Sequence, residues 1–357
     1  MPSTQSVRDT LARFHPVALS DIPTRLEKLE NLSQRFAPYS IYVKRDDQTG
    51  LAFGGNKARK LDFIMGDVLR RGADCIVTWG GVQSNWCRSV AAGAARLGIK
   101  TVLVLFKGPA SPEGIDGNLL LDRIFDAEIR MVDGAGISDM LELSSVRHVI
   151  DGVVDELRQQ GHEPYVAPIG GSMVEGSMQE PWGALGYMLA FVEIVEQAAD
   201  LGARIDSIVL ASGSGGTQAG LLAAAKLLSP HTRIIGVTVY ASAAKVTQYV
   251  LPVANGVLTK LGSTVRVERQ DVLVLEDYLR EGYGVFNEEV GEAIKLAART
   301  EGLLLDPVYT GKAMTGLIDL IQKGYFREGE NILFLHTGGT PALFPYKSRI
   351  LDHLAET

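Results

Sequence analysis

Short apolar strands that end in glycine and lead directly into helices run through most of the chain, and this alternation restricts its fold more than any other feature. CIVTW at 75–79 is followed by a glycine pair and a helical segment, and SIVLAS at 207–212 by GSGGT and another helix. Continuously apolar strands alternating with helices are typical of parallel sheets covered on both faces. The sequence therefore predicts an α/β fold.

The rest of the chain continues this alternation. We expect helices from Lys57 to 69, at 85–98, 118–125, 137–160 and 183–199, from Gln218 onward and at 288–302, and strands at 75–79, 101–106, 128–132, 165–169, 207–212, 234–239 and 331–339. No low-complexity linker separates the halves, so we predict two parallel-sheet, three-layer domains that exchange chain segments. Residues 57–175 would form the smaller domain, and 1–56 with 176–357 the larger one, with a cleft at the strand carboxyl ends.

Composition and charge exclude several classes of protein. The 357 residues can bury two cores, and the net charge of −7 offers no basic surface to nucleic acid. Cys75 and Cys87 have no partners at metal-ligand spacing, and the six histidines form no HxxxH or HExxH pair, so we expect no metal site. No segment has the pattern of a signal peptide or a membrane span. We expect a cytoplasmic protein with no membrane partner.

Three cationic side chains, Lys57, Arg59 and Lys60, follow a glycine pair in LAFGGNKARKLDF at 51–63. Apolar residues at spacings of three and four between 61 and 69 predict an amphipathic helix, so Lys57 lies near a helix N-terminus. On charge alone, each of the three could simply be solvated.

The turn SGSGGTQAG at 212–220 follows a strand and opens a helix, so its backbone N–H groups converge at the positive end of the helix dipole. This geometry suits a lone phosphate, although a tight turn without a ligand is the simpler interpretation. The turn has neither the GK[ST] of a Walker loop nor the GxGxxG spacing that a nucleotide-dependent dehydrogenase requires. A lysine beside such a pocket favours a Schiff base to pyridoxal phosphate.

Seven motifs together point to one family. They are KRDD at 44–47, GGNKARKL at 54–61, GGVQSN at 80–85, GSGGTQAG at 213–220, GYG at 282–284, LLLDPVYTGKAMTGLIDL at 303–320 and LHTGGTPALF at 335–344. Over nearly its whole length the chain resembles the fold-type II, tryptophan synthase β-like enzymes, and among them the family of D-cysteine desulfhydrase and 1-aminocyclopropane-1-carboxylate deaminase. The resemblance implies a pyridoxal 5'-phosphate cofactor, a small amino-acid substrate and a homodimer.

The resemblance also implies which residues bind the cofactor. Lys57 would carry it covalently and move the α-proton, and Lys60 would contact the phosphate, whereas Arg59 is left as solvated or structural. The other implied cofactor-binding residues are Asn85 at the ring hydroxyl, the turn residues Ser214, Gly215, Gly216 and Thr217, and Thr310 and Thr337.

Residues Ser84, Asn85 and Trp86 are the predicted substrate contacts. Ser84 and Asn85 stand where a strand ends and a helix begins, so their backbone amides could hold a carboxylate, although they could also simply cap the helix. Trp86 follows at a position where relatives commonly carry histidine or glutamine. Ser84, Tyr283 and Tyr309 join Lys57 as predicted catalytic residues, since in the family both tyrosines face the cofactor and a phenol can polarise a leaving group or relay a proton.

The motifs DPVYTGK and HTGG, with Thr310 and Thr337, resemble desulfhydrases, whereas the deaminases resemble DPVYEGK and HLGG. A neutral hydroxyl at the pyridine nitrogen makes the ring a weaker electron sink than a carboxylate does. We therefore expect a lyase that performs α,β-elimination, with D-cysteine as the first candidate substrate. Trp86 and the long segment 170–187 keep a second β-substituted amino acid, such as L-cysteate, open as a substrate. Deamination of 1-aminocyclopropane-1-carboxylate also stays open, as does a non-catalytic relative that only binds an amino acid or PLP.

Overall fold

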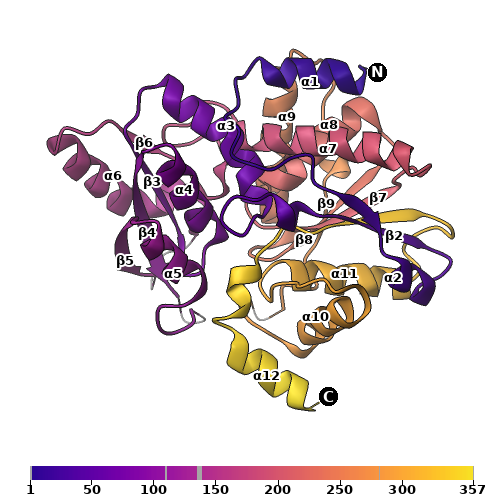
Figure 1. Ribbon diagram of the computed structural model, residues 1–357. Helices are drawn as coiled ribbons and strands as arrows, with labels where there is room; N and C mark the ends of the chain where they lie inside the picture. Colours follow the sequence, from indigo (N-terminus) through magenta and orange to yellow (C-terminus); the bar gives the residue numbers. More distant parts are fainter. Residues whose placement is uncertain (1, 109–110, 135–138, 281, 357) are drawn as a thin grey trace.

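The computed structural model describes residues 2–108, 111–134, 139–280 and 282–356, and it contains two separate β-sheets with helices on both sides of each (Figure 1). The predicted α/β class with two sheets is confirmed.

The larger sheet has six strands in the order β1-β2-β10-β7-β8-β9. Their bounds are Leu26–Lys28 for β1, Ser40–Lys44 for β2, Asn331–Leu335 for β10, Ser207–Ser212 for β7, Arg233–Thr238 for β8 and Leu273–Leu275 for β9. All neighbours are parallel except β1, which runs antiparallel to β2 at the edge. Because β10 lies between β2 and β7, both ends of the chain contribute to this sheet.

The smaller sheet has four parallel strands in the order β5-β4-β3-β6. They are β3 (Cys75–Gly81), β4 (Lys100–Lys107), β5 (Glu128–Asp133) and β6 (Pro164–Val166). All four fall inside the predicted smaller domain of residues 57–175, and the exact domain boundaries stay a prediction.

Two layers of helices cover the larger sheet. Figure 1 shows α1 (Thr4–Ala12), α7 (Trp182–Asp200), α8 (Gly216–Leu228) and α9 (Ala243–Lys260) above it, and α10 (Glu288–Glu301) and α11 (Thr310–Gln322) below it. The short α2 (Glu30–Arg35) joins the lower layer, and α12 (Lys347–Glu356) ends the described chain. Each side of the sheet has its own apolar core.

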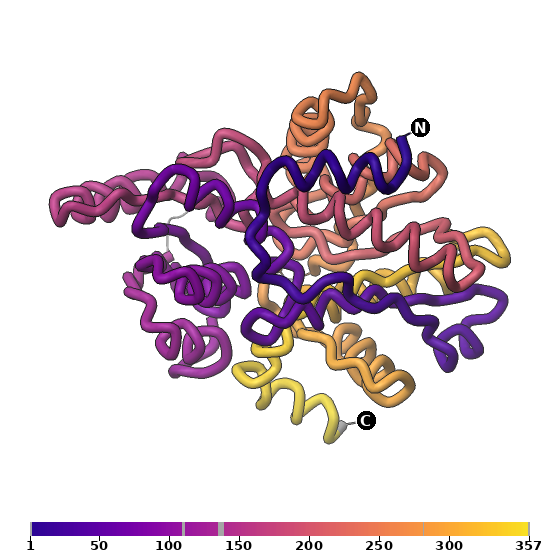
Figure 2. Tube along the Cα trace, turned by 45° about the horizontal axis from the view of Figure 1, so that its top comes forward, coloured from indigo at the N-terminus to yellow at the C-terminus, as the bar shows by residue number. Residues whose placement is uncertain are grey.

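The smaller sheet is flanked by α3 (Asn56–Arg70), α4 (Asn85–Arg96) and α5 (Gly117–Ile124) on one side and by α6 (Leu143–Gln159) on the other. Apolar side chains of α3 and α4 belong to the same buried cluster as those of α7 and α8. α3 packs against α7, the helix that covers the larger sheet, and Figure 2 shows the smaller domain and the segments around the larger sheet side by side. One continuous core therefore joins the two sheets.

The element bounds differ from the predicted ones at a few ends. The predicted strand 165–169 stops at Val166, because Pro168 is followed by a 3-10 turn, Ile169–Gly171, whose two glycines have positive φ. The predicted helix 137–160 begins at Leu143, and positions 137–138 lie outside the described residues. In the part of the chain that is described, no helix combines the length and apolarity that crossing a membrane requires.

Candidate active site

A cavity lies where the strands of both sheets end. Its wall includes Gly81 at the end of β3, Ser212 at the end of β7, Val239 just after β8 and Thr337 just after β10. Most of the predicted site residues line this cavity. They are Lys57, Lys60, Ser84, Asn85, Trp86, Ser214, Gly215, Gly216, Thr217, Tyr283, Tyr309 and Thr337. Ligands of parallel α/β proteins bind at such strand ends.

Lys57 is the second residue of α3 and lies half-buried in the cavity wall. Its Nζ donates a hydrogen bond to Asn56 Oδ1 at 3.0 Å. Burial and the nearby charge of Arg88 lower the pKa of Lys57 to about 8, although Asp306 opposes the shift. With that pKa, about a tenth of Lys57 is a neutral amine at pH 7, far more than of a solvated lysine, and the neutral amine is the form that attacks a carbonyl carbon.

Lys60 lies one turn further along α3 and is 1% exposed. Its Nζ donates to Gly170 O at 3.0 Å and to Ser172 Oγ at 3.4 Å, and no described carboxylate forms an ion pair with it. Burial and the charge of Lys57 lower the pKa of Lys60 well below its ordinary value. A buried amine of this kind favours an anion beside it, because an anion offsets the cost of burying the charge.

The glycine turn supplies the other side of this anion site. Gly215 has a φ of +77° and caps α8, which starts at Gly216, so the first N–H groups of α8 are unpaired donors aimed at the cavity. A Cβ at Gly216 would lie 3.1 Å from Lys60 Nζ and 1.9 Å from Ser172 Oγ. The turn, Lys60 and Ser172 thus lie close together, and their N–H, amine and hydroxyl groups form a cradle for an anion.

The segment from Ser84 to Trp86 begins α4. Ser84 caps this helix by accepting from Cys87 N at 3.2 Å, so the capping interpretation is correct, and its own hydroxyl proton remains available to a ligand. Trp86 lines the cavity, yet it is 2% exposed and its Nε1 donates to Thr78 Oγ1 at 2.7 Å. Because the N–H of its indole is already paired, the side chain of Trp86 offers only apolar surface to the cavity.

Tyr283 and Tyr309 share a hydrogen bond between their hydroxyls at 2.7 Å. Burial raises the pKa of both phenols, so both remain protonated at neutral pH. Tyr240, which sequence reasoning missed, packs edge-on against Tyr283 with 5.7 Å between ring centroids. Its position directly after the predicted strand 234–239 was the signal that could have identified it.

Thr310 is the predicted cofactor contact that the structure does not bring into the cavity wall. Its hydroxyl donates to Asp306 Oδ1 at 2.7 Å and accepts from Asp306 N at 2.8 Å, which holds it within the turn that opens α11. Thr337 does line the cavity, and its carbonyl accepts from Asn56 N at 3.0 Å. Direct contact between Thr310 and a ligand stays a prediction, with one lone pair of the hydroxyl available for it.

Arg59, left open between solvated and structural, is 1% exposed and therefore structural. It forms ion pairs with Asp46 at 2.9 Å and with Glu193 at 2.8 Å, and Glu193 also pairs with Lys44 at 2.8 Å. This ion-pair cluster, made of Lys44, Asp46, Arg59 and Glu193, fixes α3 to β2 and α7. It therefore positions the helix that carries Lys57.

Further wall residues that sequence reasoning missed are Met140 and Leu141, between β5 and α6. The backbone of Met140 is held from both sides, because its carbonyl accepts from Trp79 Nε1 at 2.7 Å and its N–H donates to the hydroxyl of Tyr240 at 3.0 Å. These contacts join Met140, which follows β5, to Trp79 within β3 and to Tyr240 after β8 of the other sheet, so nothing in the local sequence indicated them.

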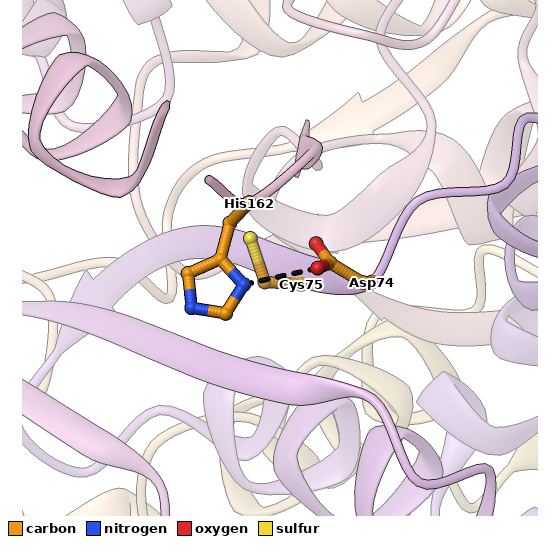
Figure 3. A group of neighbouring side chains, drawn as sticks. All are labelled: Asp74, Cys75 and His162. Atoms are coloured by element: carbon orange, nitrogen blue, oxygen red, sulfur yellow. Dashed lines mark hydrogen bonds and ion pairs between the residues drawn. The ribbon is translucent and has the colours of Figure 1, made fainter. Parts of the chain in front are cut away.

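Asp74, Cys75 and His162 form a group that the sequence spacing did not indicate (Figure 3), with ligand-type atoms within 4.8 Å of one another. Asp74 Oδ2 lies 3.0 Å from His162 Nδ1, and Asp74 Oδ1 accepts from Glu163 N at 2.8 Å. Burial raises the pKa of Cys75 to about 12, which disfavours the thiolate that a metal ion needs. These bonds link the start of β3 to the segment before β6, at the end of the sheet opposite the cavity.

The sheet arrangement, the anion cradle and the half-buried amine of Lys57 with its lowered pKa are those of an enzyme of the pyridoxal-phosphate class. A family model described as pyridoxal-phosphate dependent enzyme matches residues 17–338, and the chain belongs to this family. The family predicted from the sequence motifs is therefore confirmed, together with its fold-type II architecture and its cofactor.

Similar proteins narrow the family further. A D-cysteine desulfhydrase of Yersinia enterocolitica is 42% identical over 349 residues, covering 97% of this chain and 100% of the relative. One of Klebsiella pneumoniae is 42% identical over 340 residues, covering 94% and 97%. The solved structure of an ACC deaminase homologue superposes with a TM-score of 0.86 at 37% identity, covering 98% and 99%.

The residues in the cavity fit pyridoxal phosphate. The cradle of α8 and Lys60 suits its phosphate, and Lys57 supplies the amine for its aldehyde. Asn85 is available to its ring hydroxyl.

Proposed function

We propose that this enzyme is a lyase that eliminates the β-substituent of a small amino acid, with D-cysteine as the first substrate. The observation that carries the proposal is the pair of protonated phenols, Tyr283 and Tyr309, in the same cavity wall as the amine of Lys57. The balanced reaction converts D-cysteine and water to pyruvate, ammonia and hydrogen sulfide. The identity to D-cysteine desulfhydrases supports it.

Bound pyridoxal phosphate withdraws electrons from the α-carbon of the amino acid and so makes its α-proton acidic. The Nζ of Lys57 takes that proton. The hydroxyl of Ser84 and the free N–H groups at the start of α4 hold the substrate carboxylate. One of the hydroxyls of Tyr283 and Tyr309 donates a proton to the departing sulfur, and their mutual hydrogen bond at 2.7 Å lets the second tyrosine share the charge.

The charge of the cavity favours D-cysteine over L-cysteate. Lys57 and Lys60 are the only cationic side chains among the described wall residues, and both are assigned to the cofactor. A sulfonate would therefore be desolvated without a cation of its own, which costs free energy. The thiol of cysteine carries no such cost.

The absence of a carboxylate from the described cavity wall disfavours ring opening of 1-aminocyclopropane-1-carboxylate. With only neutral hydroxyls near the cofactor ring, the electron sink is weak, and the reaction depends on a good leaving group. A thiolate meets this requirement and a ring carbon does not.

The experiment is a substrate panel with the purified holoenzyme. D- and L-cysteine, L-cysteate, D-serine, β-chloro-D-alanine and 1-aminocyclopropane-1-carboxylate are each supplied, and keto acid is measured against time. We expect D-cysteine and β-chloroalanine to yield pyruvate. The proposal is overturned if 1-aminocyclopropane-1-carboxylate yields 2-oxobutanoate and no β-substituted alanine reacts. A yellow protein that turns over nothing would favour the non-catalytic relative.

We further propose a cytoplasmic homodimer. Three large apolar side chains are exposed on α5 and on the C-terminal segment that packs against it, Leu120, Ile124 and Phe344, with exposed fractions of 43%, 65% and 56%. Burying them against a second copy would stabilise the pair. The two cysteines are free buried thiols, consistent with a reducing compartment. Sedimentation at micromolar concentration tests the dimer, and a fully active monomer would contradict it.

A further inference from the structure

Asn85 is the residue predicted to meet the cofactor's ring hydroxyl. The orientation of its side-chain amide is determined by two successive hydrogen bonds, the first of which is made to a backbone carbonyl. Gln83 O accepts from Asn118 Nδ2 at 3.0 Å. A backbone carbonyl is always an acceptor, so it determines that the nitrogen of the Asn118 amide, and not its oxygen, faces this side.

The second proton of Asn118 Nδ2 then points to Asn85 Oδ1 at 2.9 Å. Asn85 lines the wall of the cavity. Because its Oδ1 already accepts this hydrogen bond, its Nδ2 is the side-chain group that can donate to a ligand in the cavity. Asn118 itself is fully buried and lies outside that wall. It therefore acts through Asn85.

The position of Asn118 is determined by close contacts of its own backbone and of the preceding glycine with Gln83 and Pro345. Its backbone N–H, unpaired within the first turn of α5, donates to Gln83 Oε1 at 2.9 Å. The preceding residue, Gly117, has a φ of +54°, and a Cβ there would lie 2.7 Å from Gln83 Oε1 and 2.6 Å from Pro345 Cγ. The start of α5 thus packs tightly against Gln83, in the loop directly before α4 and Asn85.

We propose that Asn118 is a positioning residue that makes Asn85 present a hydrogen-bond donor, and never an acceptor, to the ring oxygen of pyridoxal phosphate. The proposal rests on the cofactor site of the proposed function and is independent of the substrate. A donor at that position favours the ionised form of the ring hydroxyl, since hydrogen bonds to a charged acceptor are the stronger ones.

Asn118→Asp tests this proposal because it replaces the donor by an acceptor of the same shape. An aspartate oxygen facing Asn85 would turn the Asn85 amide round, so that its oxygen faces the ring oxygen. The cofactor-free variant is titrated with pyridoxal 5'-phosphate and with 3-deoxypyridoxal 5'-phosphate, which lacks the ring hydroxyl. Binding is followed by absorbance.

We expect the dissociation constant of pyridoxal phosphate to rise about tenfold or more, as expected for the loss of one hydrogen bond to a charged group. The dissociation constant of the deoxy ligand should change less than about twofold. The pH at which the visible band of bound pyridoxal phosphate titrates should move upward by about one unit, since tenfold in affinity for one protonation state equals one pH unit.

Asn255→Asp is the matched control. Like Asn118, Asn255 donates from its Nδ2 to a backbone carbonyl, that of Val267 at 2.9 Å, but it lies outside the cavity wall. It should bind both ligands as the wild type does. If Asn118→Asp does not fold, Asn118→Ala carries the same test, with a smaller loss that is again confined to the ligand with the hydroxyl. Equal losses for both ligands, or none for either, would overturn the proposal. Failure of the D-cysteine assay would leave it intact.

Discussion

Replacing Arg59 by alanine tests whether the ion-pair cluster holds α3 in place. The change removes hydrogen bonds at 2.8–3.0 Å to both oxygens of Asp46, both oxygens of Glu193 and the hydroxyl of Thr24. Two carboxylates that are at most 2% exposed are then left with Lys44 as their only cation in the cluster. The buried charge of the cluster changes from zero to −1.

Removing one partner of a buried ion pair typically costs about 3–5 kcal/mol, because the other charge stays desolvated. We expect the free energy of unfolding of Arg59→Ala to fall by that amount, measured by urea denaturation of the holoenzyme with circular dichroism. The control is Arg204→Ala, since Arg204 pairs with Asp206 at 3.0 Å but its side chain is 72% exposed. Such a surface pair contributes about 0–1 kcal/mol.

The same variant also predicts how the loss of stability changes with pH. In the wild type, burial alone would raise the pKa of Asp46. Arg59 and the other partners lower it by more than burial raises it, so the pKa of Asp46 is below its ordinary value. The associated stability is present above the unfolded pKa and is lost as the pH falls through the folded one. Without Arg59, burial should raise that pKa, and protonation would relieve the buried charge.

The stability difference between wild type and Arg59→Ala should therefore be larger at pH 7 than at pH 5. The reasoning would be refuted if Arg59→Ala lost no more stability than Arg204→Ala, or if the difference grew on acidification.

Three further predictions concern the cavity and its surroundings. Lys57→Ala should lose both the visible absorbance of bound cofactor and turnover while staying folded, because no ion pair among the described residues includes Lys57 and its Nζ bonds only to the neighbouring Asn56 there. A borohydride-reducible cofactor adduct in this variant would be inconsistent with its role. The rate at which cofactor-free wild type takes up pyridoxal phosphate should rise with pH with a midpoint near 8, the lowered pKa of Lys57, and stopped-flow absorbance showing a midpoint above 10 would contradict this. Thr310→Val should cost about 1–3 kcal/mol in urea denaturation, since Asp306 loses a donor and an acceptor. Thr300→Val is the control and should cost less, because the Thr300 hydroxyl donates to Leu296 O of its own helix.

Local patterns predicted the strands and the cavity, because a buried parallel strand and a glycine turn each leave a mark within a few residues. The prediction for Ser84 depended on such a pattern, and the serine does cap α4. Arg59 could not be placed in the same way. Its partners Asp46 and Glu193 are 13 and 134 positions away, so its burial depends on how α3 packs against α7.

Thr310 and Trp86 show that sequence motifs do not predict the direction in which a side chain points. The motif that contains Thr310 identified the family correctly, but the hydroxyl is turned toward Asp306, four positions earlier in the same motif. The indole of Trp86 is likewise paired with Thr78. A motif therefore identifies which residues occupy a site, whereas the direction of each side chain depends on the partners that the fold brings to it.

The place of β10 in the larger sheet has a consequence for biosynthesis. The strand pairs with β2 on one side and β7 on the other, in register from Asn331 opposite Ser40 to Leu335 opposite Lys44. A ribosome exposes the four strands of the smaller sheet long before it reaches β10, so that sheet can assemble during translation. In the nascent larger sheet the position between β2 and β7 stays empty until β10 has emerged from the ribosome. During this interval its unpaired strand edges are the surface that a chaperone would need to shield from aggregation.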